Sequence, residues 1–208
     1  MLTRVDHLVY AAPDLDLAVA QIEALTDVRA APGGRHPGRG TRNALLALGP
    51  TSYLEIIGPD PEQAVVERPR WFGIDDLVEP RLLTWAVSAA DLKSVVTQAA
   101  QRGVQLGEVL SGSRMRADGV TLRWRYTNPR PLVSDGLVPF FIDWADTPHP
   151  ARSAPAGAVL VALRAEHPDA TRIQNELNDF GLDLSVASAS RPALVATLDC
   201  ANGRVELR

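Results

Sequence analysis

His7 is the residue of this sequence whose type and position most directly suggest chemistry. It lies in the middle of residues 4–12, an otherwise mostly apolar run. Alternation along a strand predicts that His7 shares a face with Val5 and Val9, whereas Asp6 faces the other way. A buried imidazole needs a hydrogen-bond partner. Taken alone, such a histidine is more often a hydrogen-bonded core residue than a ligand.

Carboxylates recur in segments that align with one another. Each segment has one acid between apolar neighbours, and alternation places the acid opposite the side that packs on a helix. We therefore expect Glu55 and Asp143 on the concave face of a sheet. Glu206 has no companion histidine and is interpreted as a structural or surface acid. The aligned segments are Tyr53-Leu54-Glu55-Ile56, Phe141-Ile142-Asp143-Trp144 and Arg204-Val205-Glu206-Leu207.

These segments end three copies of one order of elements: a strand, a helix and three strands. The copies occupy about residues 1–60, 81–145 and 158–207. Helices are predicted at residues 15–25, 91–102 and 170–180, each after an aspartate suited to capping. Asp118-Gly119 and Asn202-Gly203 are typical of hairpin turns. The sequence predicts an α+β fold of repeated βαβββ modules, with one domain over residues 1–147 and a third module over residues 158–208.

Composition limits the classes of partner and compartment. The 208 residues carry a net charge of −4, which argues against nucleic-acid binding because such proteins need a basic face. No apolar run approaches the ~20 residues of a membrane span, and no targeting segment is apparent. The single Cys200 excludes an internal disulfide and a multi-cysteine metal site. We expect a cytoplasmic protein that uses neither nucleic acid nor membrane.

Three stretches together resemble the glyoxalase-like domain of the vicinal oxygen chelate superfamily, which includes glyoxalase I, extradiol dioxygenases and bleomycin-resistance proteins. The resemblance covers about residues 3–147 and implies that two modules form one cup, with the third module as a C-terminal half-cup. The stretches are His7-Leu8-Val9-Tyr10-Ala11-Ala12-Pro13-Asp14-Leu15, Gly33-Gly34-Arg35-His36-Pro37-Gly38 with Thr41-Arg42-Asn43-Ala44-Leu45, and Tyr53-Leu54-Glu55.

The resemblance implies a divalent metal ion held by the first and last strands of each module. Position by position, this ligand set falls on His7, Glu55, Trp85 and Asp143. Trp85 cannot ligate a metal, and Asp143 is a shorter carboxylate, suited to a third ligand or to the catalytic base. One imidazole with one or two carboxylates suits Zn, Fe, Mn or Ni. The alternative is a cup without metal, in which His7 and Glu55 hydrogen-bond each other.

Other residues are candidates for substrate binding. His36 and Asn43 belong to a glycine-rich loop and the strand after it, interpreted either as a loop over the mouth of the cup or as a surface turn. Trp85 is expected on the concave face as an apolar wall. Arg123 is a candidate partner for a substrate carboxylate, or is solvated or paired with Asp143. Trp144 is expected in the core beneath the helices.

Two functional hypotheses follow, with a small-molecule ligand in each. The first is a glyoxalase-like lyase or isomerase, metal-assisted through His7 and Glu55. The second is a non-catalytic binding or sequestering protein of the bleomycin-resistance type, with Trp85 stacked on a flat ligand. A third hypothesis is a vestigial cup whose open sheet edges form a homodimer.

Overall fold

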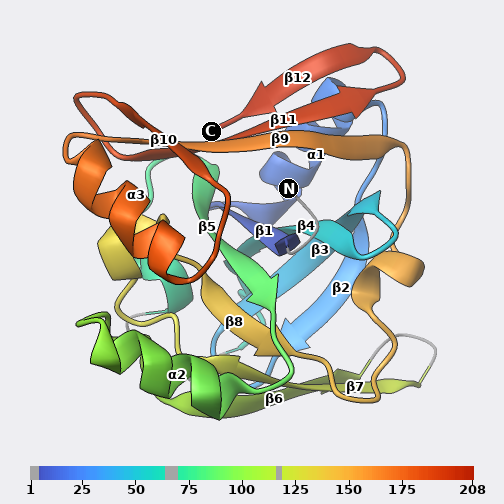
Figure 1. Ribbon diagram of the computed structural model, residues 1–208. Coiled ribbons are helices and arrows are strands. Elements are labelled where there is room, and N and C mark those ends of the chain that lie inside the picture. The colour runs from blue at the N-terminus through green and yellow to red at the C-terminus, as the bar shows by residue number, and fades with distance from the viewer. Residues whose placement is uncertain (1–4, 64–69, 116–118) are drawn as a thin grey trace.

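The computed structural model describes residues 5–63, 70–115 and 119–208, so Asp118 of one predicted turn lies outside the described residues. Its larger sheet has eight strands in the order β2-β3-β4-β1-β5-β8-β7-β6 (Figure 1). The α+β class is confirmed. The strands are β1 (Val5–Ala11), β2 (Ala31–His36), β3 (Thr41–Gly49), β4 (Ser52–Pro59), β5 (Arg81–Ser88), β6 (Val109–Met115), β7 (Thr121–Thr127) and β8 (Phe140–Asp143).

The eight strands form two modules that are joined edge to edge through their first strands. In each module the first strand runs parallel to the last, β1 beside β4 and β5 beside β8. The two first strands pair antiparallel at the centre of the sheet. The sheet curls until its ends meet, where the Arg114 guanidinium of β6 donates to the Gly33 carbonyl oxygen of β2. This closure forms a cup.

A β-bulge interrupts the central pairing. Val5 pairs with Val87 and His7 pairs with Ala86, so Asp6 is an extra residue with no partner on β5. A bulge reverses the alternation of side chains on one strand. The prediction that Val5 and His7 share a face is therefore wrong: Val5 packs on the helix side, whereas His7 lines the cup.

Helices cover the convex side of the cup. They are α1 (Leu15–Thr26) and α2 (Leu92–Gln101), and each begins at an aspartate that accepts a hydrogen bond from a backbone N–H of the first turn. Asp14 accepts from Leu17 N at 3.0 Å. The buried face of α1 presents Leu15, Val19 and Ile22 to the sheet, whereas Leu25, which continues the same helical spacing, is exposed.

The third copy builds a separate four-stranded sheet of order β10-β9-β11-β12. Its first strand pairs with β10 and β11, whereas in the cup modules the first strand pairs with the last. One hydrophobic cluster joins this sheet to the convex side of the cup (Figure 1). The elements are β9 (Ala158–His167), α3 (Ala170–Asp179), β10 (Ser185–Ser188), β11 (Ala193–Cys200) and β12 (Gly203–Leu207).

Among the residues that the structure describes, three short 3-10 helices lie in the connections: η2 (Trp71–Asp76), η3 (Val133–Gly136) and η4 (Pro150–Arg152). The last lies between the predicted domain, which ends at residue 147, and the third module, which begins at residue 158, and its N-cap is His149. The predicted glycine-rich loop is also different, because residues up to His36 form β2 and pair with β3. His36 is therefore a strand residue that points into the cup.

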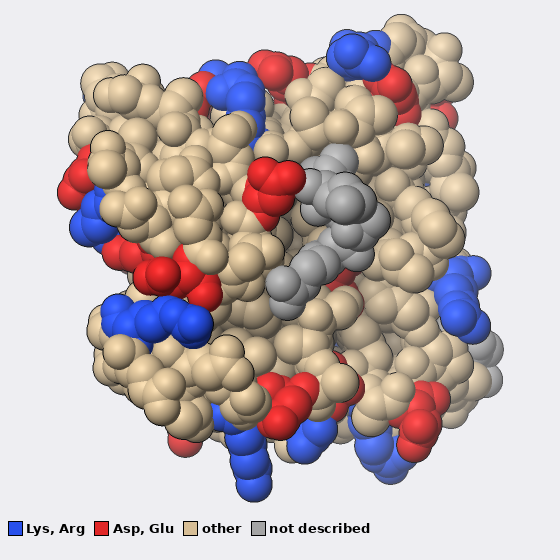
Figure 2. Space-filling model, viewed as in Figure 1, with Lys and Arg blue, Asp and Glu red and all other residues tan. Residues whose placement is uncertain are grey.

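The surface mixes both signs of charge. Figure 2 shows basic and acidic side chains interspersed over one face of the molecule. Within the described residues, no helix has both the length and the apolar character that crossing a membrane would require.

The contribution of the α1 N-cap to the stability of the first module can be tested by mutation. Asp14→Ala removes the acceptor for Leu17 N–H and should lower the free energy of unfolding by about 1 kcal/mol, measured by urea denaturation. Gln21→Ala, at an exposed position in the middle of the same helix, is the control and should change stability much less. Equal losses in both variants would contradict the capping role.

Candidate functional site

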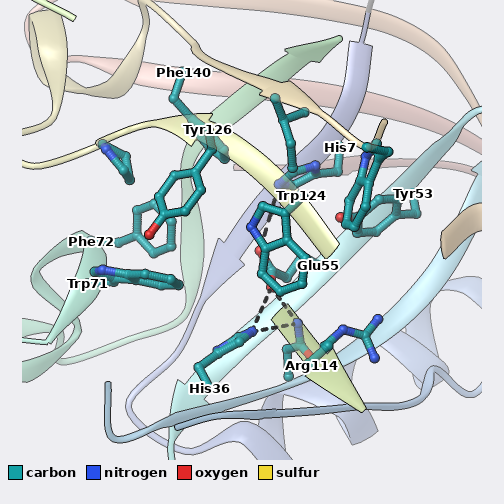
Figure 3. A pocket seen from close by; sticks show the side chains of 14 residues that line it. His7, His36, Tyr53, Glu55, Trp71, Phe72, Arg114, Trp124, Tyr126 and Phe140 are labelled. Carbon is teal, nitrogen blue, oxygen red and sulfur yellow. Dashed lines mark hydrogen bonds and ion pairs between the residues drawn. The ribbon is translucent and has the colours of Figure 1, made fainter. Parts of the chain in front are cut away.

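A cavity of about 50 Å³ lies inside the cup. Its lining divides into a polar end, made by β1, β2, β3 and β4, and an aromatic wall from the connections and the second module (Figure 3). The lining residues are His7, His36, Asn43, Tyr53, Glu55, Trp71, Phe72, Arg114, Trp124, Tyr126, Pro129, Phe140, Ile142 and Trp144.

His7 is fixed on three sides. Its Nδ1 lies 2.8 Å from Asp6 Oδ1. Its ring stacks on Tyr53, with centroids 4.7 Å apart, and meets the edge of Phe140 at 5.3 Å. Its Nε2 lies 3.8 Å from Glu55 Oε2. The imidazole therefore presents one nitrogen to the cavity and uses the other to hold its orientation.

Asp6 is the residue that sequence reasoning missed. The bulge directs its fully buried carboxylate toward four donors: His7 Nδ1, Ser88 Oγ at 2.7 Å, Trp144 Nε1 at 3.1 and 3.2 Å, and His149 Nε2 at 3.2 Å. Burial by itself raises the pKa of this carboxyl, but the hydrogen bonds from His149 and His7 outweigh it and hold the pKa well below its usual range.

The hydrogen bonds assign the proton positions on the two histidines beside Asp6. His149 Nδ1 accepts from Ala151 N–H at 3.2 Å, so Nε2 carries the proton donated to Asp6. An ionised carboxylate can only accept, so His7 Nδ1 also carries a proton. In neutral His7 the lone pair is then on Nε2, facing Glu55 and the cavity. This is the tautomer that a general base requires.

Glu55 forms the other half of the polar end. Asn43 Nδ2 donates to its Oε1 at 2.5 Å, which leaves Oε2 directed toward His7. His36 approaches Oε1 from the opposite side at 3.9 Å (Figure 3). Burial lowers the pKa of His36, and the charge of Arg114 adds to that effect against the opposing charge of Glu55. Four candidates predicted from sequence, His7, His36, Asn43 and Glu55, thus meet in one place.

The two expected ligand positions in the second module, Trp85 and Asp143, are each one residue away from the positions that match His7 and Glu55. Across the central pairing His7 faces Ala86, and Leu8 faces Trp85. Trp85 is buried in the helix-side core, where its Nε1 donates to Leu137 O at 2.9 Å. The expectation that Trp85 walls the cavity is wrong, because the position that matches His7 is Ala86.

The same displacement affects the last strand of the second module. Tyr53 pairs with His7 and Phe140 pairs with Ala86, so the residue that matches Glu55 is Ile142. Asp143 turns away from the cavity, and its carboxylate accepts from Arg125 Nη2 at 2.5 Å. Assignment of Asp143 as a third ligand or catalytic base is therefore contradicted by its position.

Strand β7 turns its tryptophan inward and its arginines outward. Trp124 and Tyr126 line the cavity, whereas Arg123 is exposed and lies outside it. Trp144 also lines the cavity, although it was expected in the helix-side core. Gly112 makes room for Trp124, since a Cβ there would lie 2.4 Å from its Cε2. The only sequence sign of this wall is the alternation of Trp124 with Tyr126.

The donor set fits a divalent metal centre poorly. Of the four matched positions, His7 and Glu55 carry donors, whereas Ala86 and Ile142 are apolar. In the described parts of the chain, no three His, Cys, Asp or Glu side chains converge as a metal-binding group. Catalytic zinc sites use three protein ligands and structural ones four. We therefore derive no step through a metal ion.

Comparison with known proteins identifies the family. The family described as the glyoxalase-like domain matches residues 5–181. The chain belongs to the glyoxalase-like domain family. The match includes both modules of the cup and continues through the first strand and helix of the third unit. No curated protein matches the chain.

Several solved structures are similar to this glyoxalase-like protein. A hypothetical protein from Staphylococcus aureus is 15% identical, with a TM-score of 0.63, and the match covers 97% of this chain and 83% of that one. Methylmalonyl-CoA epimerase from Mycobacterium tuberculosis is 18% identical over 70% of this chain and 89% of its own, with a TM-score of 0.44. A variant of the Streptomyces coelicolor epimerase in complex with 2-nitronate-propionyl-CoA is 19% identical, covers 71% and 98%, and has a TM-score of 0.45.

The loss of stability caused by Asp6→Asn should depend on pH, because the Asp6 carboxylate is ionised and hydrogen-bonded in the folded protein. A group with a lowered folded pKa stabilises the fold above its unfolded pKa, ~3.9 for Asp, and loses that contribution as pH falls through the folded value. We expect the variant to be about 2–3 kcal/mol less stable at pH 7, with the deficit shrinking below pH ~4 in urea titrations. Asp199→Asn, at an exposed ion pair, should lose far less. A deficit independent of pH would contradict this account.

Ile142→Glu should test the displaced register. It places a second carboxylate opposite Glu55, so the variant should bind Zn²⁺ at least tenfold more tightly than the parent protein in calorimetric titrations. Zn²⁺ should also raise its melting temperature. Asp143→Glu is the matched control and should leave the affinity for Zn²⁺ unchanged. A gain in the control alone would restore the sequence-based alignment.

Proposed function

We propose that this protein is a small-molecule isomerase or lyase that moves a proton at a carbon next to a carbonyl group. The observation that carries this proposal is the orientation of His7, whose Nδ1 is bound to a buried carboxylate and whose Nε2 faces the cavity and Glu55. A base held in the right tautomer at a water-poor site is suited to general acid–base catalysis.

The geometry gives each residue a distinct task. His7 Nε2 takes the proton from carbon as the C–H electron pair forms a C=C bond and the carbonyl oxygen gains charge, which produces an enediolate. The 3.8 Å between His7 Nε2 and Glu55 Oε2 lets one substrate group contact both. Glu55 Oε2 then accepts a hydrogen bond from a substrate hydroxyl, while Asn43 keeps the other carboxylate oxygen in place.

Asp6 supports this chemistry without touching the substrate. When His7 gains a proton, the positive charge forms 2.8 Å from an ionised carboxylate, which stabilises the imidazolium. The return of a proton to the same carbon gives exchange with solvent. Its return to the neighbouring carbon, which was the carbonyl carbon, gives isomerisation, as the hydroxyl group on the first carbon becomes the new carbonyl and its proton passes to the former carbonyl oxygen. The departure of a leaving group from the enediolate gives the lyase outcome.

A non-catalytic binding protein is the second candidate. The aromatic wall favours it, because a ligand could be held there without any chemistry at His7. The two candidates differ in whether a proton moves.

Proton exchange tests the proposal. We expect the protein to catalyse incorporation of deuterium into the CH₂ group of 2-hydroxyacetophenone in D₂O, followed by NMR. His7→Gln and Glu55→Gln should each slow exchange by about 10²–10⁴-fold, and Asp199→Asn should not change it. A chelator should leave the rate unchanged.

The opposite results are equally informative. Binding of the ketone without exchange would favour the second candidate. Exchange that requires an added divalent ion would show that His7 and Glu55 act with a metal, contrary to this proposal.

A further inference from the structure

The cavity collects most of the aromatic side chains of a chain that is poor in them. The sequence holds four Trp, three Tyr and four Phe residues. Three of the Trp, two of the Tyr and two of the Phe residues line this one cavity. A protein core does not require this concentration, because the helix-side core is built mainly from Leu, Val, Ile and Ala.

The aromatic wall forms two groups of rings. In one, Trp71 contacts Tyr126, with ring centroids 5.8 Å apart. In the other, Trp124 lies 5.4 Å from Trp144. The three indoles are only half-buried, so they reach from the cavity to its mouth, and Figure 3 shows Trp71 and Trp124 on different sides of the space above Glu55.

The size of the cavity limits how a ligand enters. The cavity is partly open, and its volume of about 50 Å³ is roughly a third of the ~150 Å³ cavity that holds a benzene molecule. A ring therefore lies partly between the half-buried indoles, with its substituent in the cavity. That substituent meets His7 Nε2 and Glu55 Oε2.

The polar end selects against an anionic substituent. Glu55 supplies a carboxylate, and burial keeps His36 from gaining a positive charge. Arg114, which lines the cavity, donates to the carbonyl oxygen of Gly33, and the guanidinium of Arg39 lies over the Trp71 ring, 5.0 Å from its centroid. A neutral oxygen, as a hydroxyl or carbonyl group, matches an acceptor carboxylate and an imidazole better than a carboxylate or phosphate would.

We propose that the ligand of this site is a neutral, planar ring compound that carries a hydroxyl or carbonyl group at one end. The ring lies between the indoles of Trp71 and Trp124, and the oxygen-bearing end reaches His7 and Glu55. This inference rests on the proposed function for the orientation of the polar end, but the aromatic contact is independent of any chemistry.

Binding of matched probes tests whether the site prefers an aromatic ring. Isothermal titration of the full chain with 2-hydroxyacetophenone should give a dissociation constant about three- to tenfold lower than with its cyclohexyl analogue, 1-cyclohexyl-2-hydroxyethanone, because ring stacking is lost in the latter. Mandelate, which has the same ring with a carboxylate, should bind at least tenfold more weakly than the ketone.

Variants locate the contact. Trp124→Leu should weaken binding of the ketone and remove the preference for the aromatic ring over the cyclohexyl ring. Gly112→Ala should have the same effect by displacing Trp124, without removing any aromatic group. Phe180→Leu, a half-buried aromatic residue that packs on Phe141 outside the cavity, is the control and should leave both affinities unchanged.

Two results would overturn the inference. Equal affinity for the aromatic and cyclohexyl ketones would show that the wall is merely apolar, and tighter binding of mandelate would make Arg114 the recognition group. Failure of the proposed function is distinguishable, because the parent protein would then prefer the aromatic ketone in binding but would catalyse no exchange. If both proposals hold, His7→Gln abolishes exchange but retains the preference for the aromatic ring.

Discussion

The buried carboxylate of Asp6 is the interaction on which the site depends. Four donors from three parts of the chain converge on it: His7 from β1, Ser88 from β5, and Trp144 and His149 from the segment after β8. An isolated charge at this depth would cost several kcal/mol. The donors offset that cost, so the carboxylate favours the arrangement of these segments that brings the donors together.

The order of elements could be predicted from the sequence because it depends on local signals. Aspartate caps, apolar spacing in the helices and glycines after them are read over a few residues, and they place α1, α2 and α3 within one or two residues of their bounds. The facing of Tyr53 and Glu55 into the cup could also be predicted, since β4 follows regular alternation. Family membership agrees with this part of the prediction.

The register of the second module could not be predicted in the same way. Side chains on a strand alternate with a period of two, so an error of one residue moves every side chain to the other face. Alignment of the repeated segments selected Trp85 and Asp143, whereas pairing across the bulge at Asp6 selects Ala86 and Ile142. Nothing in the sequence around Asp6 signals that bulge. The expected site therefore included Trp85 and Asp143, which face away from the cavity, and omitted Trp124 and Trp144, which line it.

The segment between β8 and β9 is held by contacts at two separate points. His149 contacts Asp6 at one end of it, and the carbonyl oxygen of Pro155 accepts from Ala47 N–H at 2.8 Å where the chain enters the third unit. Order in this segment is thus shared between the cup and the packing of the second sheet. If binding at His7 and Asp6 changed the order of this segment, thermodynamic reciprocity would require the attachment of the C-terminal sheet to change the binding free energy by the same amount.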